Sequence, residues 1–270
     1  MNKYAGRRVL QFNVFKNRIF DEISNPNKYL GVQCTGLPKF NSIIKGLRMG
    51  ELSIFTGPTG SGKTTFLSQL SLDYCVKNIP TLWGSFEIPP SRLLKKMMTQ
   101  YNAKPILAEE FDQVANDFSK VPMHILDFFG STYINELLPE LDYSVQELGV
   151  RHIVIDNMQF MLSGQAGRID KYQLQDDVLS AFRHFATSRQ VHVTLVMHPR
   201  KEATDDVKLG MSSIYGSVKA TQEADNVFIL QRLNGDLRSL QVKKNRFDGH
   251  VGTVELMFDR DSEQLYETAE

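Results

Sequence analysis

The sequence predicts an α/β fold with a mostly parallel central sheet and helices on both faces. Two observations predict it. Segments with the apolar pattern of strands alternate with segments of helical periodicity, and the glycine-rich run GPTGSGKT lies between one such strand and the next helix. The last strands are joined by short turns such as NGDL and FDGH, so we expect an antiparallel β extension at the carboxyl end.

The amino-terminal part of the chain is expected to contain one helix and otherwise turn and loop. Apolar residues at helical spacing predict a helix over residues 15–23. The stretch SNPNKY then predicts a turn, and GVQCTGLPKF a loop. Residues 1–45 are therefore predicted to be a linker and helix segment, and residues 46–270 the α/β domain.

Strands and helices alternate through the rest of the chain. Strands are expected within residues 52–56, 81–88, 121–130, 152–161, 191–199, 226–231, 239–247 and 251–259. Helices are expected after the glycine-rich run and within residues 89–103, 134–148 and 177–190. Pro105 lies inside another stretch of helical pattern, 101–118, and argues against a continuous helix there.

Length and composition are those of a globular domain. The 270 residues suffice for one large α/β domain with an appendage, and no apolar run has the length of a bilayer span. Lys plus Arg and Asp plus Glu both number 31, so any nucleic-acid binding has to use a local basic patch. The two cysteines form no CxxC pair, which indicates neither a zinc site nor a disulfide framework and favours a reducing compartment.

The first twenty residues carry five Lys or Arg and no acid, as a mitochondrial transit peptide does. They are also poor in Ser and have bulky apolar residues at helical spacing, which favours a packing or linker segment. Both interpretations stay open at this point.

The run GPTGSGKT satisfies the phosphate-loop pattern G-x-x-x-x-G-K-[ST] and stands between a strand and a helix, where its chemistry requires it. Its glycines let backbone N–H groups face the phosphates of ATP, and Lys63 is expected to contact the β- and γ-phosphates. The alternative is a glycine-rich turn that only starts a helix. The predicted nucleotide-binding residues here are Gly57, Pro58, Thr59, Gly60, Ser61, Gly62, Lys63, Thr64 and Thr65.

The strand IVIDN ends in Asp156, which is expected to hold Mg²⁺ together with the Thr64 hydroxyl. As an alternative, Asp156 caps the turn that follows. Hydrolysis also requires a base that orients water toward the γ-phosphate. Glu87 stands at the end of TLWGSFEI, a strand expected beside that of the phosphate loop, so its carboxylate is expected to project over the same crevice and is a candidate for this role. A surface glutamate at a strand end is the plain alternative.

Several blocks together resemble one family. GELSIFTGPTGSGKTTF, TLWGSFEI, HIVIDNMQFM, HVTLVMHPRKE, GSVKATQEADNVFIL and KNRFDGHVG occur in this order. They resemble the helicase domain of the Twinkle-like mitochondrial replicative DNA helicases and, more loosely, phage helicase–primases and bacterial replicative helicases. The likeness runs from about Phe15 to Phe258 and implies a RecA-like P-loop ATPase fold.

The resemblance also implies roles for single residues. Glu87 matches the catalytic glutamate, and His198 the histidine that senses the γ-phosphate; a strand-end histidine bonded to backbone is its alternative. Arg246 resembles the arginine finger that reaches the ATP of the adjacent subunit, with Lys244 beside it. A site completed in this way requires a ring, so the resemblance implies a hexamer or heptamer.

Two further positions match the family less closely. Arg232 resembles a position near the nucleotide, with a solvated turn residue as the alternative. Gln222 lies where relatives place a polar contact near the ring's channel or the nucleotide.

Single-stranded DNA is the partner that the resemblance implies, and two loops are expected to face it. Grips on single strands rely on backbone phosphates, which Lys and Arg bind without reading sequence. Both loops also carry acids, so a solvated loop of mixed charge is the alternative. The expected DNA-binding residues are Arg168, Lys171, Arg200, Lys201 and Lys208.

The chain departs from the family at its start. In the relatives a primase-like or zinc-containing region precedes the motor, whereas this chain starts at the segment that resembles the linker helix. We expect either a truncated or a naturally short protein. Phe15, Ile19 and Ile23 form an apolar stripe that would pack on a neighbouring subunit or on the chain's own core.

The predicted function is that of a ring-forming replicative helicase that uses ATP and Mg²⁺ to move along single-stranded DNA, with other replisome proteins as further partners. The resemblance places it in mitochondria. The alternatives are a RecA-like recombinase that coats DNA and a regulatory, clock-type ATPase of the same superfamily. The paired basic loops and the KNRFDG block argue against the last.

Overall fold

The structure is a computed structural model that describes residues 9–165, 170–199, 209–210 and 218–268. Within these residues the strands form one nine-stranded sheet in the order β3-β2-β4-β5-β1-β6-β7-β8-β9. The strands are β1 (Leu52–Thr56), β2 (Thr81–Ser85), β3 (Met123–Ile125), β4 (His152–Asp156), β5 (His192–Met197), β6 (Asn226–Arg232), β7 (Leu237–Asn245), β8 (Gly252–Asp259) and β9 (Gln264–Glu267).

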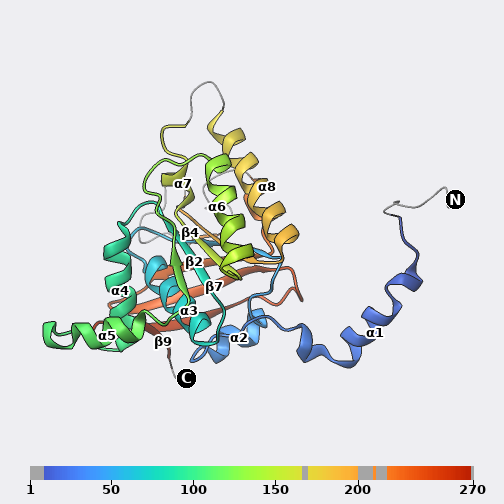
Figure 1. Ribbon diagram of the computed structural model, residues 1–270. Coiled ribbons are helices and arrows are strands. Elements are labelled where there is room, and N and C mark those ends of the chain that lie inside the picture. The colour runs from blue at the N-terminus through green and yellow to red at the C-terminus, as the bar shows by residue number, and fades with distance from the viewer. Residues whose placement is uncertain (1–8, 166–169, 200–208, 211–217, 269–270) are drawn as a thin grey trace.

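Helices connect the parallel strands and cover both faces of the sheet (Figure 1). The α-helices are α1 (Lys16–Ser24), α2 (Pro38–Ile44), α3 (Lys63–Val76), α4 (Pro90–Asn102), α5 (Phe111–Phe118), α6 (Ile134–Glu147), α7 (Met158–Met161), α8 (Lys171–Arg189) and α9 (Val218–Glu223). Short 3-10 helices occupy Phe12–Val14, Pro26–Tyr29 and Ala108–Glu110.

The predicted α/β fold with a mostly parallel sheet is confirmed. The six strands from β3 to β6 pair in parallel, and β6 to β9 pair antiparallel. Two details of the prediction need correction. The strand at 81–88 was expected beside the strand of the phosphate loop, but β2 pairs with β3 and β4, and the strands β4 and β5 separate it from β1. The strand at 226–231 was expected in the antiparallel extension, but β6 is also the last parallel strand because it pairs with β1. The extension gains β9, which the sequence pattern did not indicate.

Each face of the sheet carries its own hydrophobic core. Alternation along β1 shows this, since Leu52 and Ile54 join the core beneath α6, α8 and α9 while Phe55 joins the core beneath α2, α3 and α4. The largest buried side chain is Trp83, whose indole N–H donates to Ser71 Oγ at 2.9 Å. Burial on both faces fixes the central strands and with them the loops at their ends.

The helical stretch that contains Pro105 is interrupted, as its sequence indicated. Helix α4 ends at Asn102, and Ala103 has a φ of 56°, in the left-handed region that commonly closes a helix. A 3-10 helix and α5 follow. The stretch therefore forms separate short helices beside the sheet edge that β3 closes.

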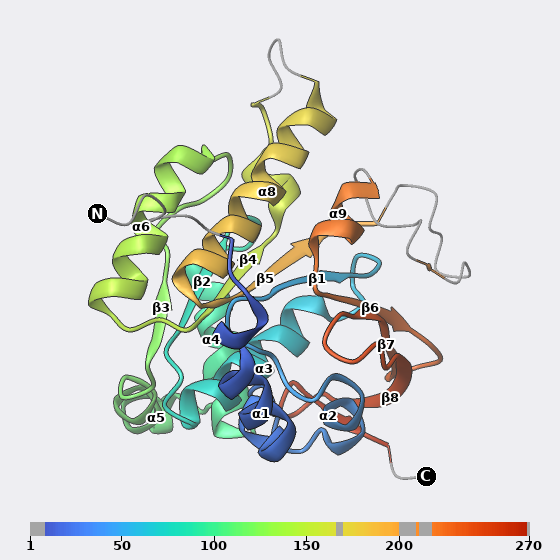
Figure 2. The same ribbon diagram turned by 90° about the vertical axis from the view of Figure 1, so that its right-hand side faces the viewer.

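The amino-terminal segment contains two helices, one packed in the core and one exposed. Helix α2, which begins within the expected loop, buries Phe40 and Ile44 in the core beneath α3. The expected helix at 15–23 forms as α1, but it stands away from the body of the molecule in Figure 1, and in the turned view of Figure 2 it lies in front of the body. Phe15, Ile19 and Ile23 are exposed, by 75% in the case of Ile23, so the stripe does not pack on the chain's own core. None of the described helices is long and apolar enough to cross a membrane.

The two helices are expected to contribute very differently to stability. Ile44→Ala should lower the free energy of unfolding by about 2–5 kcal/mol, because it leaves a cavity in a packed core. Ile23→Ala should change it by less than about 0.5 kcal/mol, because its side chain is already in solvent. Denaturant unfolding measures both variants, and equal losses would contradict this placement of α1.

Candidate nucleotide-binding site

Four parallel strands bring the predicted site residues to one edge of the sheet. The carboxyl ends of β1 and β5 are neighbours, with Thr56 opposite Met197, and those of β2 and β4 are neighbours, with Ser85 opposite Asp156. The phosphate loop, Glu87 and His198 directly follow the ends of β1, β2 and β5. Residues that are distant in sequence therefore converge where α/β sheets bind their ligands.

The phosphate loop has a backbone that requires its glycines. A Cβ on Gly57 would lie 2.1 Å from the carbonyl oxygen of Leu230 in β6, a contact that no side chain can make. Gly62 has a φ of 100°, in the left-handed region, and it is the residue from which α3 begins. The loop thus turns tightly against β6 and presents the amino-terminal end of α3, which favours an anion.

Lys63, Thr64 and Asp156 meet at the start of α3. The Lys63 ammonium donates to the carbonyl oxygens of Gly57 at 2.8 Å and Pro58 at 2.9 Å. The Thr64 hydroxyl donates to Asp156 Oδ2 at 2.6 Å. Burial raises the pKa of Asp156 to about 6, although the Thr64 hydrogen bond and the Lys63 charge oppose the rise. Burial also lowers the pKa of Lys63, against the attraction of Asp156 and Glu87.

These groups fit a triphosphate and a magnesium ion. The hydroxyl of Thr64 and the carboxylate of Asp156 are the oxygen ligands that Mg²⁺ takes alongside phosphates. A cation there would favour the ionised carboxylate that burial disfavours. The buried Ser61 Oγ has no hydrogen-bond partner among the described residues, so it leaves a polar group inside the loop for a phosphate oxygen. Thr65, by contrast, is buried on the helix side, where its carbonyl accepts from Ser68 and Gln100.

Glu87 and His198 are joined by a residue that the sequence patterns did not single out. Asn157 Nδ2 donates to Glu87 Oε2 and lies 2.8 Å from His198 Nε2. The two outer groups are 3.5 Å apart. Burial lowers the pKa of His198, and the Lys63 ammonium lowers it further. The Glu87 carboxylate raises this pKa, but the net shift is downward and favours the neutral imidazole.

Of the two arginines near the end of β6, Arg238 contacts the phosphate loop, and Arg232 is the one predicted to lie near the nucleotide. Arg232 lies at the correct edge, but its Nε donates to Gly235 O at 3.3 Å. The side chain of Arg238 is buried, and its Nε donates to Ser61 O at 3.2 Å. A local pattern could not reveal this contact, because Arg238 reaches the loop from the antiparallel strand β7.

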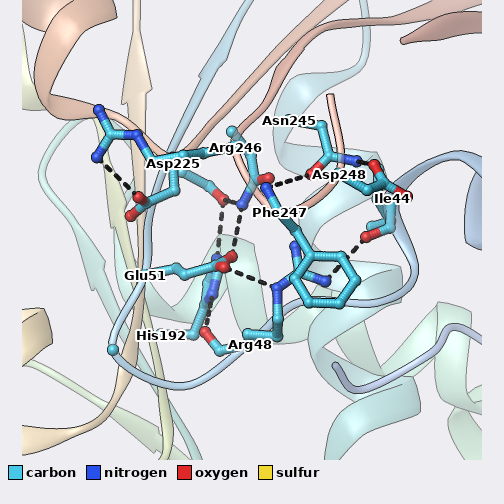
Figure 3. A network of polar contacts seen from close by, with 12 residues as sticks. Ile44, Arg48, Glu51, His192, Asp225, Asn245, Arg246, Phe247 and Asp248 are labelled. Atoms are coloured by element: carbon cyan, nitrogen blue, oxygen red, sulfur yellow. Dashed lines mark hydrogen bonds and ion pairs between the residues drawn. The ribbon is translucent and has the colours of Figure 1, made fainter. Parts of the chain in front are cut away.

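Arg246 lies at the opposite edge of the sheet. It follows β7, and its Nη1 pairs with Asp225 Oδ1 at 3.0 Å (Figure 3). Asp225 is buried, pairs also with Arg183, and accepts from the backbone N–H of Leu52, where β1 begins. Since β1 has five residues, about 16 Å separate this point from the phosphate loop at ~3.3 Å per residue. Arg246 is thus not brought to the phosphate loop of its own chain.

The neighbours of Arg246 hold its turn in place. Arg246 Nη2 donates to Gln222 O at 2.6 Å, and Lys244 Nζ donates to Thr221 O at 2.7 Å, so both cations contact carbonyls at the end of α9. The next residue, Phe247, has the guanidinium of Arg48 over its ring at 4.0 Å (Figure 3). Lys244 therefore lies with Arg246 and away from its own phosphate loop, and Gln222 meets both cations through its backbone carbonyl.

The expected DNA-binding residues are largely outside the described part of the chain. Lys171 is the first residue of α8, after Asp170, whose side chain accepts from the backbone N–H of Tyr172. The structure leaves the placement of the other four untested: Arg168, Arg200, Lys201 and Lys208 lie outside the described residues.

Several curated proteins are similar in sequence to this chain over most of its length. A DNA helicase/primase of Enterobacteria phage T3 is 24% identical over 278 residues, which cover 95% of this chain and 49% of that protein. The replicative DNA helicase DnaB of Treponema pallidum is 21% identical, covering 93% of this chain and 61% of DnaB. The circadian clock protein KaiC3 of Synechocystis is 26% identical, covering 80% and 41%. The chain thus spans about half the length of the curated relatives it matches.

Solved structures support the fold. A DnaB-like replicative helicase superposes with a TM-score of 0.81 at 16% sequence identity, covering 97% of this chain and 68% of that chain. A separately solved ATPase domain superposes with a TM-score of 0.83 at 17% identity, covering 96% of this chain and 99% of that domain. The central sheet and its helices therefore have the RecA-like fold.

One family model matches the part of the chain that carries the site. The family described as the AAA domain matches residues 30–204, which include the phosphate loop, Glu87, Asp156 and His198. This match covers more than half of the chain and all four strands from which these residues extend, β1, β2, β4 and β5. The chain belongs to this AAA domain family.

Proposed function

We propose that this chain is the motor domain of a ring-forming replicative DNA helicase that hydrolyses ATP. One observation carries the proposal. The groups needed for phosphate binding and hydrolysis converge at one edge of the sheet, and Arg246 lies half-exposed at the other. The relatives named as a DNA helicase/primase and as a replicative DNA helicase support it.

The phosphate loop and Asp156 are proposed to bind ATP and Mg²⁺. The Gly57–Thr65 loop surrounds the phosphates with backbone N–H groups, and Lys63 neutralises their charge. Thr64 and Asp156 would hold the metal, which would stabilise the negative charge that develops on the phosphates. Arg238 holds the loop through Ser61 O.

Glu87 is proposed as the base that orients and deprotonates the attacking water, and His198 as the group that contacts the γ-phosphate. Glu87 is suited to this because its side chain is one-third exposed and lies at the end of the strand beside β4. His198 is suited because it is neutral and follows β5, so that a change in its hydrogen bonds would move the segment after it.

Arg246 is proposed to serve the ATP of a neighbouring chain, with Lys244 beside it. A guanidinium suits the charge that builds on the phosphoryl group. Because the strand β1 separates Arg246 from its own phosphate loop, only a neighbour can receive it, and a closed hexameric or heptameric ring satisfies every site. Arg232, at the phosphate-loop edge, is proposed to lie near the nucleotide.

Single-stranded DNA is the proposed track. The loops after β4 and β5 start at the same edge as the ATP site, and they carry the proposed contacts Arg168, Lys171, Arg200, Lys201 and Lys208. Backbone phosphates would be their target.

The type of helicase and the domain bounds are proposed as follows. We infer a Twinkle-like mitochondrial helicase that works with other replisome proteins. Residues 1–45 would form the linker segment and residues 46–270 the motor. The exposed stripe of α1 suits a neighbouring subunit.

A regulatory ATPase is the second candidate function, and the similarity to a circadian clock protein favours it. DNA separates the two candidates. We expect ATP hydrolysis to rise when single-stranded oligonucleotides of unrelated sequence are added, and the rise to shrink with added salt because counterions compete for the phosphates. Phosphate release measures the rate, with duplex DNA as the comparison. A rate indifferent to DNA would favour the regulatory ATPase.

Glu87→Gln is expected to lower ATP turnover by at least about 10²-fold, because the amide cannot accept the proton of water. Nucleotide affinity should persist, since Lys63, Thr64 and Asp156 remain. Steady-state hydrolysis and fluorescent-nucleotide titration measure the two quantities. Glu109→Gln, at an exposed position, is the matched control. Wild-type turnover in Glu87→Gln would remove Glu87 from its role.

A further inference from the structure

Asn157 occupies the centre of the hydrolytic site. It directly follows β4, whose neighbours are β2 and β5, and its side chain is fully buried. Its amide nitrogen contacts Glu87 Oε2, from the loop after β2, and His198 Nε2, from the loop after β5. One side chain therefore links the proposed base to the proposed phosphate sensor.

The chemistry of the amide determines the state of both partners. An amide nitrogen has two N–H donors and accepts nothing, so His198 Nε2 must accept, and the imidazole proton must lie on Nδ1. The other N–H binds one oxygen of the Glu87 carboxylate. With both N–H groups in use, the amide lies between Glu87 and His198, whose Oε2 and Nε2 are only 3.5 Å apart. This distance already allows a long direct contact, and without the amide the two groups would pair more closely, so that the base would share a proton with the histidine.

The two ends of the Asn157 amide have separate tasks. Its oxygen accepts from the backbone N–H of Phe160 at 3.0 Å and so caps α7. The backbone of His198 is held independently, because its N–H donates to Gln159 Oε1 at 3.1 Å. Loss of the Asn157 nitrogen alone would therefore free the two functional side chains without releasing the cap or the β5 end.

We propose that Asn157 is a positioning residue for ATP hydrolysis, which orients the Glu87 carboxylate and fixes His198 as the neutral Nδ1–H tautomer. The inference rests on the proposed hydrolytic function of the site. It adds a requirement to that function. Glu87 and His198 act only when Asn157, at the end of β4, supplies a hydrogen-bond donor between them.

Asn157→Ser tests the proposal, because serine keeps a capping oxygen but has no amide nitrogen. We expect kcat to fall roughly 10- to 100-fold, since a small misplacement of catalytic groups has effects of this size. KM, nucleotide affinity and melting temperature should stay near wild type. Asn157→Asp, which keeps shape and cap but replaces the donor with a second acceptor, should lose at least as much. Asn116→Ser, on the exposed face of α5, is the matched control.

A spectroscopic readout separates positioning from a purely structural role. In ¹⁵N NMR of the wild-type chain at neutral pH, the His198 signal, assigned by its absence in His198→Gln, should show a protonated Nδ1 and an unprotonated Nε2. In Asn157→Ser this tautomer preference should be lost. Wild-type kcat in Asn157→Ser, or a protonated Nε2 in the wild-type chain, would overturn the proposal. A wild-type chain that showed the expected tautomer but no ATP hydrolysis would instead refute the proposed function.

Discussion

In a parallel sheet the amino-terminal and carboxyl-terminal ends of the strands lie on opposite sides, and the proposed mechanism depends on this separation. The phosphate loop, Asp156 and His198 follow the carboxyl ends of their strands, whereas the Asp225–Arg246 ion pair lies where β1 begins. Both faces of the sheet are covered by packed helices, so neither edge can bend toward the other. Arg246 is therefore held away from the phosphate loop of its own chain, and in the proposed mechanism it serves the phosphates of a neighbouring chain.

Burial and charge are balanced differently at the two edges. At the phosphate edge, burial opposes the charge of both Asp156 and Lys63, which favours binding of a charged ligand and metal that restore it. At the other edge, buried Asp225 is matched by two arginines and a backbone N–H, so its charge is satisfied within the chain. One edge is thus prepared for a ligand, and the other presents a firmly held cation.

The fold class and some residues of the site could be predicted from the sequence, because short sequence patterns indicate both. The phosphate loop, the strand end at Asp156 and the position of Glu87 need only a strand and a turn to be recognised. Contacts made across the sheet could not be predicted in this way. Arg238 reaches the loop from an antiparallel strand, Asp225 pairs with residues of α8 and of the turn after β7, and Asn157 gains its partners only when three strands align. Helix α2 was missed because its short apolar pattern follows a proline in a loop-like segment.

The central claim is that ATP bound by one chain is hydrolysed with Arg246 of its neighbour. The most direct measurement mixes two variants that are each inactive alone, Arg246→Ala and Lys63→Ala, and follows ATP hydrolysis as their ratio changes. Mixed oligomers contain sites with an intact phosphate loop on one side and an intact Arg246 on the other, so the account predicts partial recovery that peaks at intermediate ratios. No recovery under conditions where mixed oligomers demonstrably form would contradict it.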